Sequence, residues 1–351
     1  MFLKTYDVAV SESLEIFKEK RKWILMKVSD NSSFKWMEDA LEKIPENNSP
    51  LRDVLLGLTN PRSDPVANNI NNNPTKYQNK ALDDSQKRAV QFALQQKEIG
   101  VIHGPPGTGK TTTLVEIVHQ TVGRGEKVLV TAASHVAVDN IAERLARDRL
   151  NILRIGHPAR ITSESVLEHT LDVRVGEQIE AVGKIQFDYD TVIKRLHAGV
   201  FRLKAEANTL KKRLYKEKAK LKKMKEKQIL EADVVLGTLI GCGSQLEFLE
   251  KRPHFQLVII DECGQSLEMA CWVVIHRAPK LILAGDHHQL PPTVISKSAA
   301  VSAALSKSLM ERFFDLYFYN IGGAVMLQVV HNSLKIILDK LISTPIPNIY
   351  I

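Results

Sequence analysis

The sequence of 351 residues has few cysteines and no long apolar run, and each shortage excludes a class of protein. Three cysteines are too few and too scattered for a disulfide framework or a metal knuckle. They stand among apolar or small residues, which predicts buried, reduced thiols: Cys242, Cys263 and Cys271. No apolar run reaches the 18 residues of a membrane span, and the N-terminus lacks the apolar core of a signal peptide. We therefore expect an intracellular, soluble protein without membrane contact, located in the nucleus, the cytoplasm or both.

Positive charge is the property that the chain has in excess, and it is concentrated in one segment. Residues 201–227 contain twelve Lys or Arg and three Glu, a net charge of +9. This segment alone exceeds the net charge of +8 of the whole chain. Such a local surplus predicts contact with a polyanion, with Lys211, Lys212 and Arg213 as candidate residues. The alternative is a solvated helical face that binds nothing specific.

A Gly-rich stretch between an apolar run and a helical pattern is the strongest signal in the sequence. The run 99–102 predicts a strand, and residues 114–118 have helical spacing, which is the context of a phosphate-binding loop. Lys110 would contact the β- and γ-phosphates of a nucleotide, and the Thr111 hydroxyl would bind Mg²⁺. The alternative is a glycine-rich turn that binds nothing. The predicted nucleotide-binding residues are Gly104, Pro105, Pro106, Gly107, Thr108, Gly109, Lys110, Thr111 and Thr112.

Two further strand ends carry polar residues that suit nucleotide hydrolysis. Asp261 follows the apolar run 255–260 and would bind Mg²⁺ through water, opposite Thr111. Glu262 would orient or deprotonate the attacking water. Gln289, after the run 281–284, has an amide that could sense the γ-phosphate. The alternative for Asp261 and Glu262 is an ordinary acidic turn at the end of a strand. We expect the adjacent His287 and His288 to be exposed polar residues rather than metal ligands.

Short apolar runs alternate with helical patterns, which predicts an α/β fold with a parallel sheet. The expected strands are 99–103, 127–132, 152–155, 234–236, 257–261 and 281–284. Residues 163–231 interrupt this pattern, and apolar residues at spacings of three and four predict an inserted basic helical hairpin. A short strand is expected at 6–10, and helices are expected around 11–27, 33–43 and 50–58. The Asn- and Pro-rich segment 61–80 reads as a linker. Asp84 or Ser85 would cap the next helix, which runs to about Gln96. The predicted nucleotide domain is therefore 81–162 together with 232–325, followed by a tail at 326–351.

The motifs 104–111, 261–265 and 285–292 resemble motifs I, II and III of superfamily 1 helicases, in the branch of nonsense-decay and immunoglobulin mu-binding helicases. This resemblance implies a RecA-like core that hydrolyses ATP with Mg²⁺ and moves 5′ to 3′ along single-stranded DNA or RNA. It implies that residues 1–60 are the remnant of a barrel and helical stalk. The resemblance extends to 82–90, 128–145, 234–244 and 305–312. It makes Gln86 the residue that reads adenine, and it assigns nucleic-acid contacts to Ser134, His135, Asn140 and Thr238.

The sequence departs from the family pattern in two places. Ala133-Ser134-His135 stands where relatives have Pro-Ser-Asn or similar. Residues 326–333 resemble the next family motif without its Tyr-Arg-Met core. Comparison with the family pattern leads us to expect that the second RecA-like domain is absent from this sequence. We therefore expect a truncated, impaired motor that binds Mg·ATP and hydrolyses it weakly. The alternatives are a non-motor nucleic-acid-binding or regulatory module and, third, a P-loop kinase or small-molecule ATPase.

Overall fold

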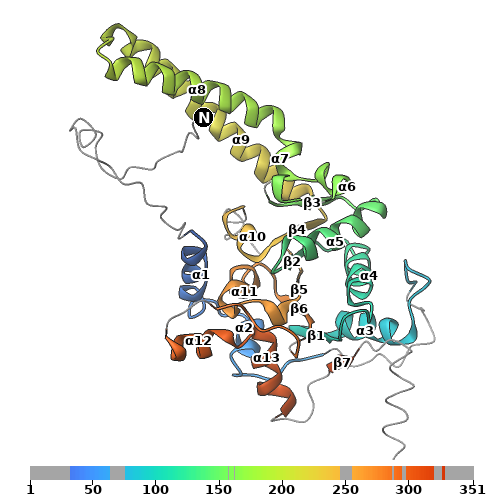
Figure 1. The fold of residues 1–351 in the computed structure, drawn as a ribbon. Coiled ribbons are helices and arrows are strands. Elements are labelled where there is room, and N and C mark those ends of the chain that lie inside the picture. Colours follow the sequence, from blue (N-terminus) through green and yellow to red (C-terminus); the bar gives the residue numbers. More distant parts are fainter. Residues whose placement is uncertain are drawn as a thin grey trace, which may run out of the picture.

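A parallel seven-stranded sheet forms the centre of the computed structural model, with the strand order β3-β4-β2-β5-β6-β1-β7 (Figure 1). The structure describes residues 32–63, 76–156, 158–161, 163–245, 255–286, 288–294, 298–319 and 326–328. The strands are β1 (Ile99–His103), β2 (Val128–Ala132), β3 (Ile152–Arg154), β4 (Val234–Thr238), β5 (Leu257–Asp261), β6 (Lys280–Gly285) and β7 (Met326–Gln328). All six strands expected from the sequence are present, and the α/β, RecA-like fold class is confirmed.

Helices cover both faces of the sheet, which explains why its strands are largely apolar. One core lies under α3 (Asp84–Gln95), α4 (Lys110–Val122) and α5 (His135–Arg147). The other lies under α1 (Ser32–Glu42), α2 (Pro50–Leu55), α10 (Leu239–Gln245), α11 (Glu268–Ile275) and α13 (Leu309–Phe314). Alternate residues of β2 enter the two cores, Val128 and Val130 on one side and Leu129 on the other. A strand buried on both faces favours apolar side chains, and the polar exception in β2, Thr131, donates its hydroxyl to the Ile259 carbonyl at 3.0 Å.

The N-terminal helices pack on the second face of the sheet. Helix α1 lies against α11 and α10, and Ser49 caps α2 by accepting from the Arg52 N–H. The expected strand at 6–10, the expected helix at 11–27 and residues 64–75 of the expected linker lie outside the described residues. The expected cap of α3 was wrong by one or two positions, since Asp83, rather than Asp84 or Ser85, accepts from the Gln86 N–H at 2.8 Å.

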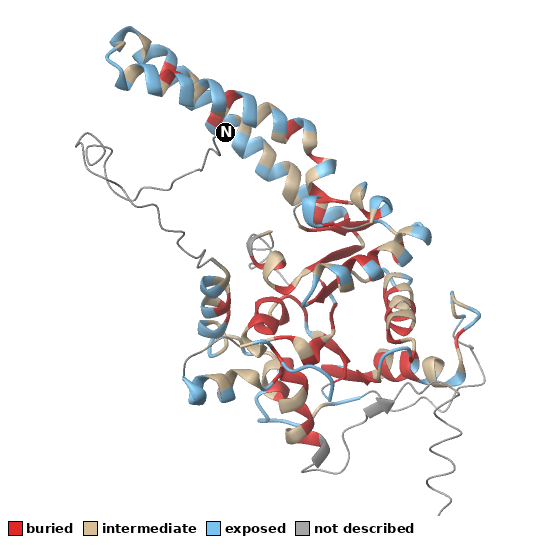
Figure 2. Ribbon diagram, viewed as in Figure 1, coloured by how far each residue is buried: buried red, intermediate tan, exposed pale blue. Residues whose placement is uncertain are grey.

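The insertion forms the helical hairpin that the spacing of apolar residues predicts. Helices α8 (Gly176–His197) and α9 (Lys204–Glu231) run side by side away from the sheet, preceded by the short helices α6 (Glu164–Leu167) and α7 (Leu171–Arg174) (Figure 1). Ile185, Val192, Ala207 and Leu214 are buried along the seam, and most of the hairpin surface is exposed (Figure 2). None of the helices in the described part of the chain has the length and apolarity needed to cross a membrane.

Strand β7 was not expected from the sequence. It pairs in parallel with β1, with Gln328 opposite His103, and extends the sheet beyond β1. Its three residues resemble the start of a family motif, and a run of that length is too short to predict a strand. The rest of the tail 329–351 lies outside the described residues, and the domain boundaries remain predictions.

Candidate nucleotide and nucleic-acid site

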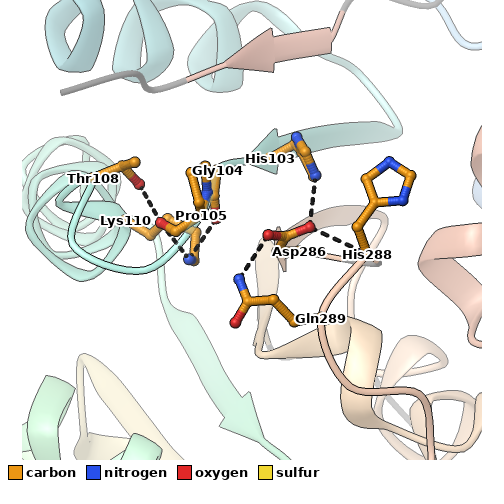
Figure 3. Close-up of polar contacts among 8 residues, drawn as sticks. All are labelled: His103, Gly104, Pro105, Thr108, Lys110, Asp286, His288 and Gln289. Carbon is orange, nitrogen blue, oxygen red and sulfur yellow. Dashed lines mark hydrogen bonds and ion pairs between the residues drawn. The ribbon is translucent and has the colours of Figure 1, made fainter. Parts of the chain in front are cut away.

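The Gly-rich stretch forms a loop between β1 and α4, closed by its own lysine (Figure 3). The Lys110 Nζ donates to the Gly104 carbonyl at 2.6 Å and to the Pro105 carbonyl at 3.2 Å. The Thr108 hydroxyl also donates to the Pro105 carbonyl, at 2.8 Å. An ammonium has three donors, so these two carbonyls fix the Lys110 position and leave it able to contact an anion. The loop opens onto the N-terminus of α4, where partial positive charge favours phosphate.

Two glycines give the loop its shape. Gly107 and Gly109 have φ of 80° and 82°, which side-chain-bearing residues rarely adopt. A Cβ on Gly109 would lie 2.3 Å from the Gln86 Nε2, whereas a Cβ on Gly107 would meet nothing within 4 Å. The Gln86 amide therefore lies against the loop. It donates to the Thr108 carbonyl at 3.5 Å and accepts from the Asp83 N–H at 3.1 Å.

Asp261 and Glu262 stand at the end of β5, beside the loop. Asp261 is 4% exposed, and its burial, together with the Glu262 carboxylate, raises its pKa to about 6. The positive charge of Lys110 acts in the opposite direction on that pKa, which indicates that the two predicted motifs face each other. Glu262 has a φ of 52°, its N–H donates to the Asp261 Oδ1 at 2.9 Å, and its carboxylate accepts from the Gln265 amide at 3.1 Å.

Gln289 takes part in a polar cluster that joins the ends of β1 and β6 (Figure 3). Its amide donates to the Asp286 Oδ2 at 2.6 Å, and the His103 Nε2 lies 3.1 Å from the Asp286 Oδ1. The His288 N–H donates to the same carboxylate at 3.0 Å, and these contacts lower the pKa of Asp286 although its burial acts the other way. Burial lowers the pKa of His103. The second histidine of the sequence pair, His287, lies outside the described residues.

Gly285 brings the three motifs together. Its carbonyl accepts from the Gly104 N–H at 3.2 Å, which ties the end of β6 to the start of the loop. A Cβ at Gly285 would lie 3.2 Å from the Cys263 backbone nitrogen and 3.3 Å from that of Gly264. The close approach of these backbones explains why a glycine stands at the end of β6.

The donors that could hold a divalent cation are oxygens. Thr111 is the second residue of α4 and Asp261 ends β5, and hydroxyl and carboxylate oxygens are ligands of Mg²⁺. Within the described ranges, no group of three or more His, Cys, Asp or Glu could hold a metal ion. These residues fit an ion that is shared with phosphate oxygens and water, which is how Mg²⁺ is bound in nucleotide sites. Thr112, the remaining predicted residue of the loop, accepts from the Arg144 guanidinium at 2.9 Å.

A groove of about 620 Å³ lies between the sheet edge and the base of the hairpin, and we call it the strand groove. It contains two of the predicted nucleic-acid contacts, His135 and Thr238. Two others, Ser134 just before α5 and Asn140 near its middle, are exposed and do not line the groove. The Ser134 hydroxyl caps α5 by accepting from the Ala137 N–H. The lining residues of the strand groove are Ser33, Trp36, His135, Ile155, Gly156, Arg160, Leu171, Asp172, Lys225, Thr238, Ile240, Gly241 and Gln245.

The three predicted basic contacts of the hairpin do not line this groove. Lys211, Lys212 and Arg213 are exposed in the outer half of α9, and Lys212 stands about 30 Å from the helix end at Glu231 at 1.5 Å per residue. Sequence reasoning missed the two cations that do line the groove, Arg160 and Lys225. Lys225 could have been found within the basic run, whereas nothing near Arg160 in the sequence marks it.

A buried ion pair that the sequence did not reveal positions His135. Arg154 has no exposed surface, and its Nε donates to the Asp139 Oδ1 at 2.8 Å. The same guanidinium lies 3.2 Å from the His135 Nδ1 and contacts the Ile155 carbonyl. Burial and the charge of Arg154 lower the pKa of His135. Strand β3 thus holds the first residue of α5 at the edge of the strand groove.

Comparison with known proteins gives consistent matches. A family model described as an AAA domain matches residues 81–297. DNA-binding protein SMUBP-2 of Mesocricetus auratus is 42% identical over 343 residues, which cover 93% of this chain and 33% of that protein. DNA polymerase alpha-associated DNA helicase A of Schizosaccharomyces pombe is 41% identical, with 65% of this chain and 34% of that protein covered. The regulator of nonsense transcripts 1 homolog of Drosophila melanogaster is 38% identical, with 67% of this chain and 19% of that protein covered.

The chain therefore spans about a third of the length of the first of these relatives. Three ordered motifs meet at one end of a RecA-like sheet, and the matched region contains all of them. The chain belongs to the AAA-domain family and, within it, to the superfamily 1 helicases of the branch that contains SMUBP-2 and the regulator of nonsense transcripts 1.

Proposed function

We propose that this chain binds Mg·ATP and hydrolyses it in response to single-stranded DNA or RNA held in the strand groove. The observation that carries the proposal is that Lys110, Asp261 and Gln289 stand at or just beyond the carboxyl ends of three adjacent strands, β1, β5 and β6, of one sheet. The relatives that match are named as helicases or as DNA-binding proteins, which supports a motor enzyme. A protein of this kind would act in the nucleus, the cytoplasm or both.

Each residue at the junction has a chemical task in this proposal. Lys110 would neutralise the β- and γ-phosphates, and Thr111 and Asp261 would hold Mg²⁺, which would supply Lewis-acid stabilisation of the phosphate charge. Glu262, at a strained backbone position next to Asp261, orients the attacking water and accepts its proton. Gln86 contacts the adenine edge, since its amide lies against the loop.

Gln289 links the nucleotide to the rest of the sheet. Gln289 is an exposed residue, and its amide donates a hydrogen bond to Asp286. Asp286 also contacts His103 at the start of the loop. A γ-phosphate that draws the Gln289 amide away from Asp286 would alter the hydrogen bonds of β1 and β6 together. The loss of that phosphate would restore them, which makes the cluster a sensor of hydrolysis.

Movement along a strand in the 5′ to 3′ direction is the activity that the family resemblance implies. It requires two domains that close on one ATP, and an added arginine typically raises turnover 10³- to 10⁵-fold. Because the described residues form one RecA-like sheet, we expect the 351-residue chain on its own to hydrolyse ATP slowly and not to unwind duplexes.

A second candidate is a non-motor module that binds nucleic acid and ATP without productive hydrolysis. The protruding basic hairpin favours it, because affinity for a polyanion needs no hydrolysis.

The deciding experiment is ATP turnover by the 351-residue chain with and without single-stranded DNA or RNA. Lys110→Ala is the blank, and it should abolish nucleotide binding. Turnover that exceeds the blank and rises with single strands supports the ATPase. Binding of ATP and single strands with turnover equal to the blank supports the non-motor module. A chain that binds neither contradicts both.

A further inference from the structure

One face of α9 carries cations at regular spacing and begins in the strand groove. Its residues are separated by four, three, four and three positions, so they lie on one side of the helix: Lys211, Tyr215, Lys218, Lys222 and Lys225. We call this set the lysine-tyrosine face. It extends about 21 Å at 1.5 Å per residue. Lys225 is its inner end and lines the groove beside Thr238 and His135.

Contacts with α8 and α7 fix the direction of this face. The Lys218 Nζ donates to the Gln186 Oε1 of α8 at 2.9 Å, and the Lys225 Nζ lies 3.5 Å from the Asp172 Oδ1 of α7. Both contacts leave the remaining lysines of the face exposed to solvent. The face is therefore continuous from the strand groove to the outer half of the hairpin.

The opposite side of the hairpin has a different charge character. A groove of about 430 Å³ there is lined by four carboxylates and three cations. Its charged residues are Glu177, Glu180, Asp188, Glu217, Lys184, Arg213 and Lys220. Carboxylates repel phosphate, so a nucleic acid that follows the hairpin has a favourable path on the lysine-tyrosine face and an unfavourable one across the hairpin.

Tyr215 identifies the form of nucleic acid that fits this face. Its side chain is 78% exposed, with Lys211 and Lys218 one helical turn away on either side. Exposed aromatic rings between cations stack on unpaired bases, and each stacked base contributes substantially whatever its sequence. The bases of a duplex are stacked on one another and offer no free face except at its ends. The chemistry of Tyr215 thus favours a single strand.

We propose that a single strand leaving the strand groove continues along the lysine-tyrosine face, with its phosphates on Lys211, Lys218 and Lys222 and a base stacked on Tyr215. This inference rests on the proposed function, because it extends the path of the same bound strand. It separates the three basic residues singled out in the sequence: Lys211 belongs to the path, and Lys212 and Arg213 do not.

The test compares the binding of two single strands to the 351-residue chain by fluorescence anisotropy over a range of salt concentrations. A strand of about six nucleotides occupies the groove alone, and one of about twenty reaches the hairpin. The triple variant Lys211→Ala/Lys218→Ala/Lys222→Ala should weaken binding of the long strand roughly ten-fold or more and lower its salt slope by about two. Binding of the short strand should stay unchanged.

The matched control is Lys212→Ala/Lys216→Ala/Lys223→Ala, which removes three exposed lysines of the same helix at other positions around it. It changes the net charge equally, so it should retain most of the affinity and the salt slope for the long strand. Tyr215→Ala should weaken the long strand roughly five-fold or more, and Tyr215→Phe should not, because the ring that stacks is kept.

The outcomes separate this inference from the function on which it rests. Equal losses for the two triple variants, or equal affinity of the unaltered chain for the short and the long strand, overturn the lysine-tyrosine face and leave the groove intact. Tighter binding of a duplex than of the long strand also overturns it. Failure to bind either single strand contradicts the proposed function itself.

Discussion

At the scale of single residues, the most consequential perturbation is the raised pKa of Asp261. Its carboxyl is 4% exposed, lies next to Glu262 and has a pKa of about 6, against an ordinary value of 3.8. The folded state therefore holds a proton more tightly than the unfolded state does. The stability that this proton provides is present below about pH 4 and is lost as the pH rises through about 6. At neutral pH the ionised form costs the nucleotide-free protein roughly 3 kcal/mol.

Asp261→Asn should therefore raise the melting temperature of the nucleotide-free chain at pH 7.5 and have little effect at pH 4. The same variant should lose the stabilisation that Mg·ATP gives to the unaltered chain, because the amide is a poor ligand for Mg²⁺. Thermal melts at both pH values, with and without Mg·ATP, measure both effects. A variant that melts lower than the unaltered chain at pH 7.5 would show that Asp261 stabilises the fold as an anion.

Gly109 and Gly107 allow a paired test of how the loop holds Gln86. Alanine imposes the same strain at both, because both have φ near 80°. At Gly109 the new Cβ also displaces the Gln86 amide. Because this amide is the end of a flexible side chain, it can move away from the adenine position at little cost to the stability of the fold. Gly109→Ala should thus remove the effect of a second change, Gln86→Ala, on the Kd for ATP. The coupling should be about 1 kcal/mol, the value of one hydrogen bond.

Gly107→Ala is the control for this cycle, since no atom lies within 4 Å of its added Cβ. In that background Gln86→Ala should weaken ATP binding as much as it does in the unaltered chain. An equal coupling energy between Gln86→Ala and each of the two glycine variants would mean that Gly109 does not position the Gln86 amide.

The strand, loop and helix around the Gly-rich stretch could be predicted because their signal is local. A strand, three glycines and Lys110 lie within one short stretch, and the fold of that stretch determines its chemistry. The contact of His103 with Asp286, the residue that holds the Gln289 amide, was not predicted, because His103 and Asp286 meet only when β1 and β6 pair. Arg160 is a clearer case, since it lines the strand groove only because the fold brings the segment after β3 beside Thr238 and Lys225.

At the scale of elements, the Arg154–Asp139 pair joins β3 to α5. Both side chains are buried, with 0% and 2% of each residue exposed. Asp139→Ala leaves the guanidinium buried without its carboxylate, which should lower the free energy of unfolding by roughly 3–5 kcal/mol. It should also weaken binding of the short single strand, because Arg154 no longer holds His135 in the strand groove. Urea unfolding and anisotropy measure the two effects.

Glu180→Ala provides the control, because it breaks the exposed Glu180–Lys184 pair of α8. It should leave the melting temperature unchanged. A small effect of Asp139→Ala on stability would indicate that water reaches Arg154 in solution.

The elements themselves show where sequence patterns succeed. Helix α9 was expected because apolar residues recur every three or four positions over a long segment, and Ala207 and Leu214 are indeed buried against α8. Strand β7 has only three residues, and its pairing with β1 depends on a neighbour more than two hundred residues away. Patterns within the chain cannot report such a pairing.

At the scale of the whole molecule, two bodies of different character are joined at the strand groove. The sheet and its covering helices contain both apolar cores, and the hairpin is a narrow arm with most of its surface exposed (Figure 2). The base of the arm belongs to the sheet, because Ile229 and Leu171 are buried in one of the two cores. The Arg174 guanidinium also donates to the Ile152 carbonyl of β3 at 2.8 Å.

This division predicts that the outer arm can be removed without loss of the nucleotide site. Replacing residues 178–222 with a short Gly-Ser linker keeps Arg174, Lys225 and Ile229, so the base of the arm and the lining of the strand groove remain. The shortened chain should bind ATP with unchanged Kd and bind the short single strand as before. It should lose the added affinity for the long strand, together with its steeper salt dependence, because the lysine-tyrosine face is gone. Loss of ATP binding would instead show that the sheet needs the outer arm for its structure.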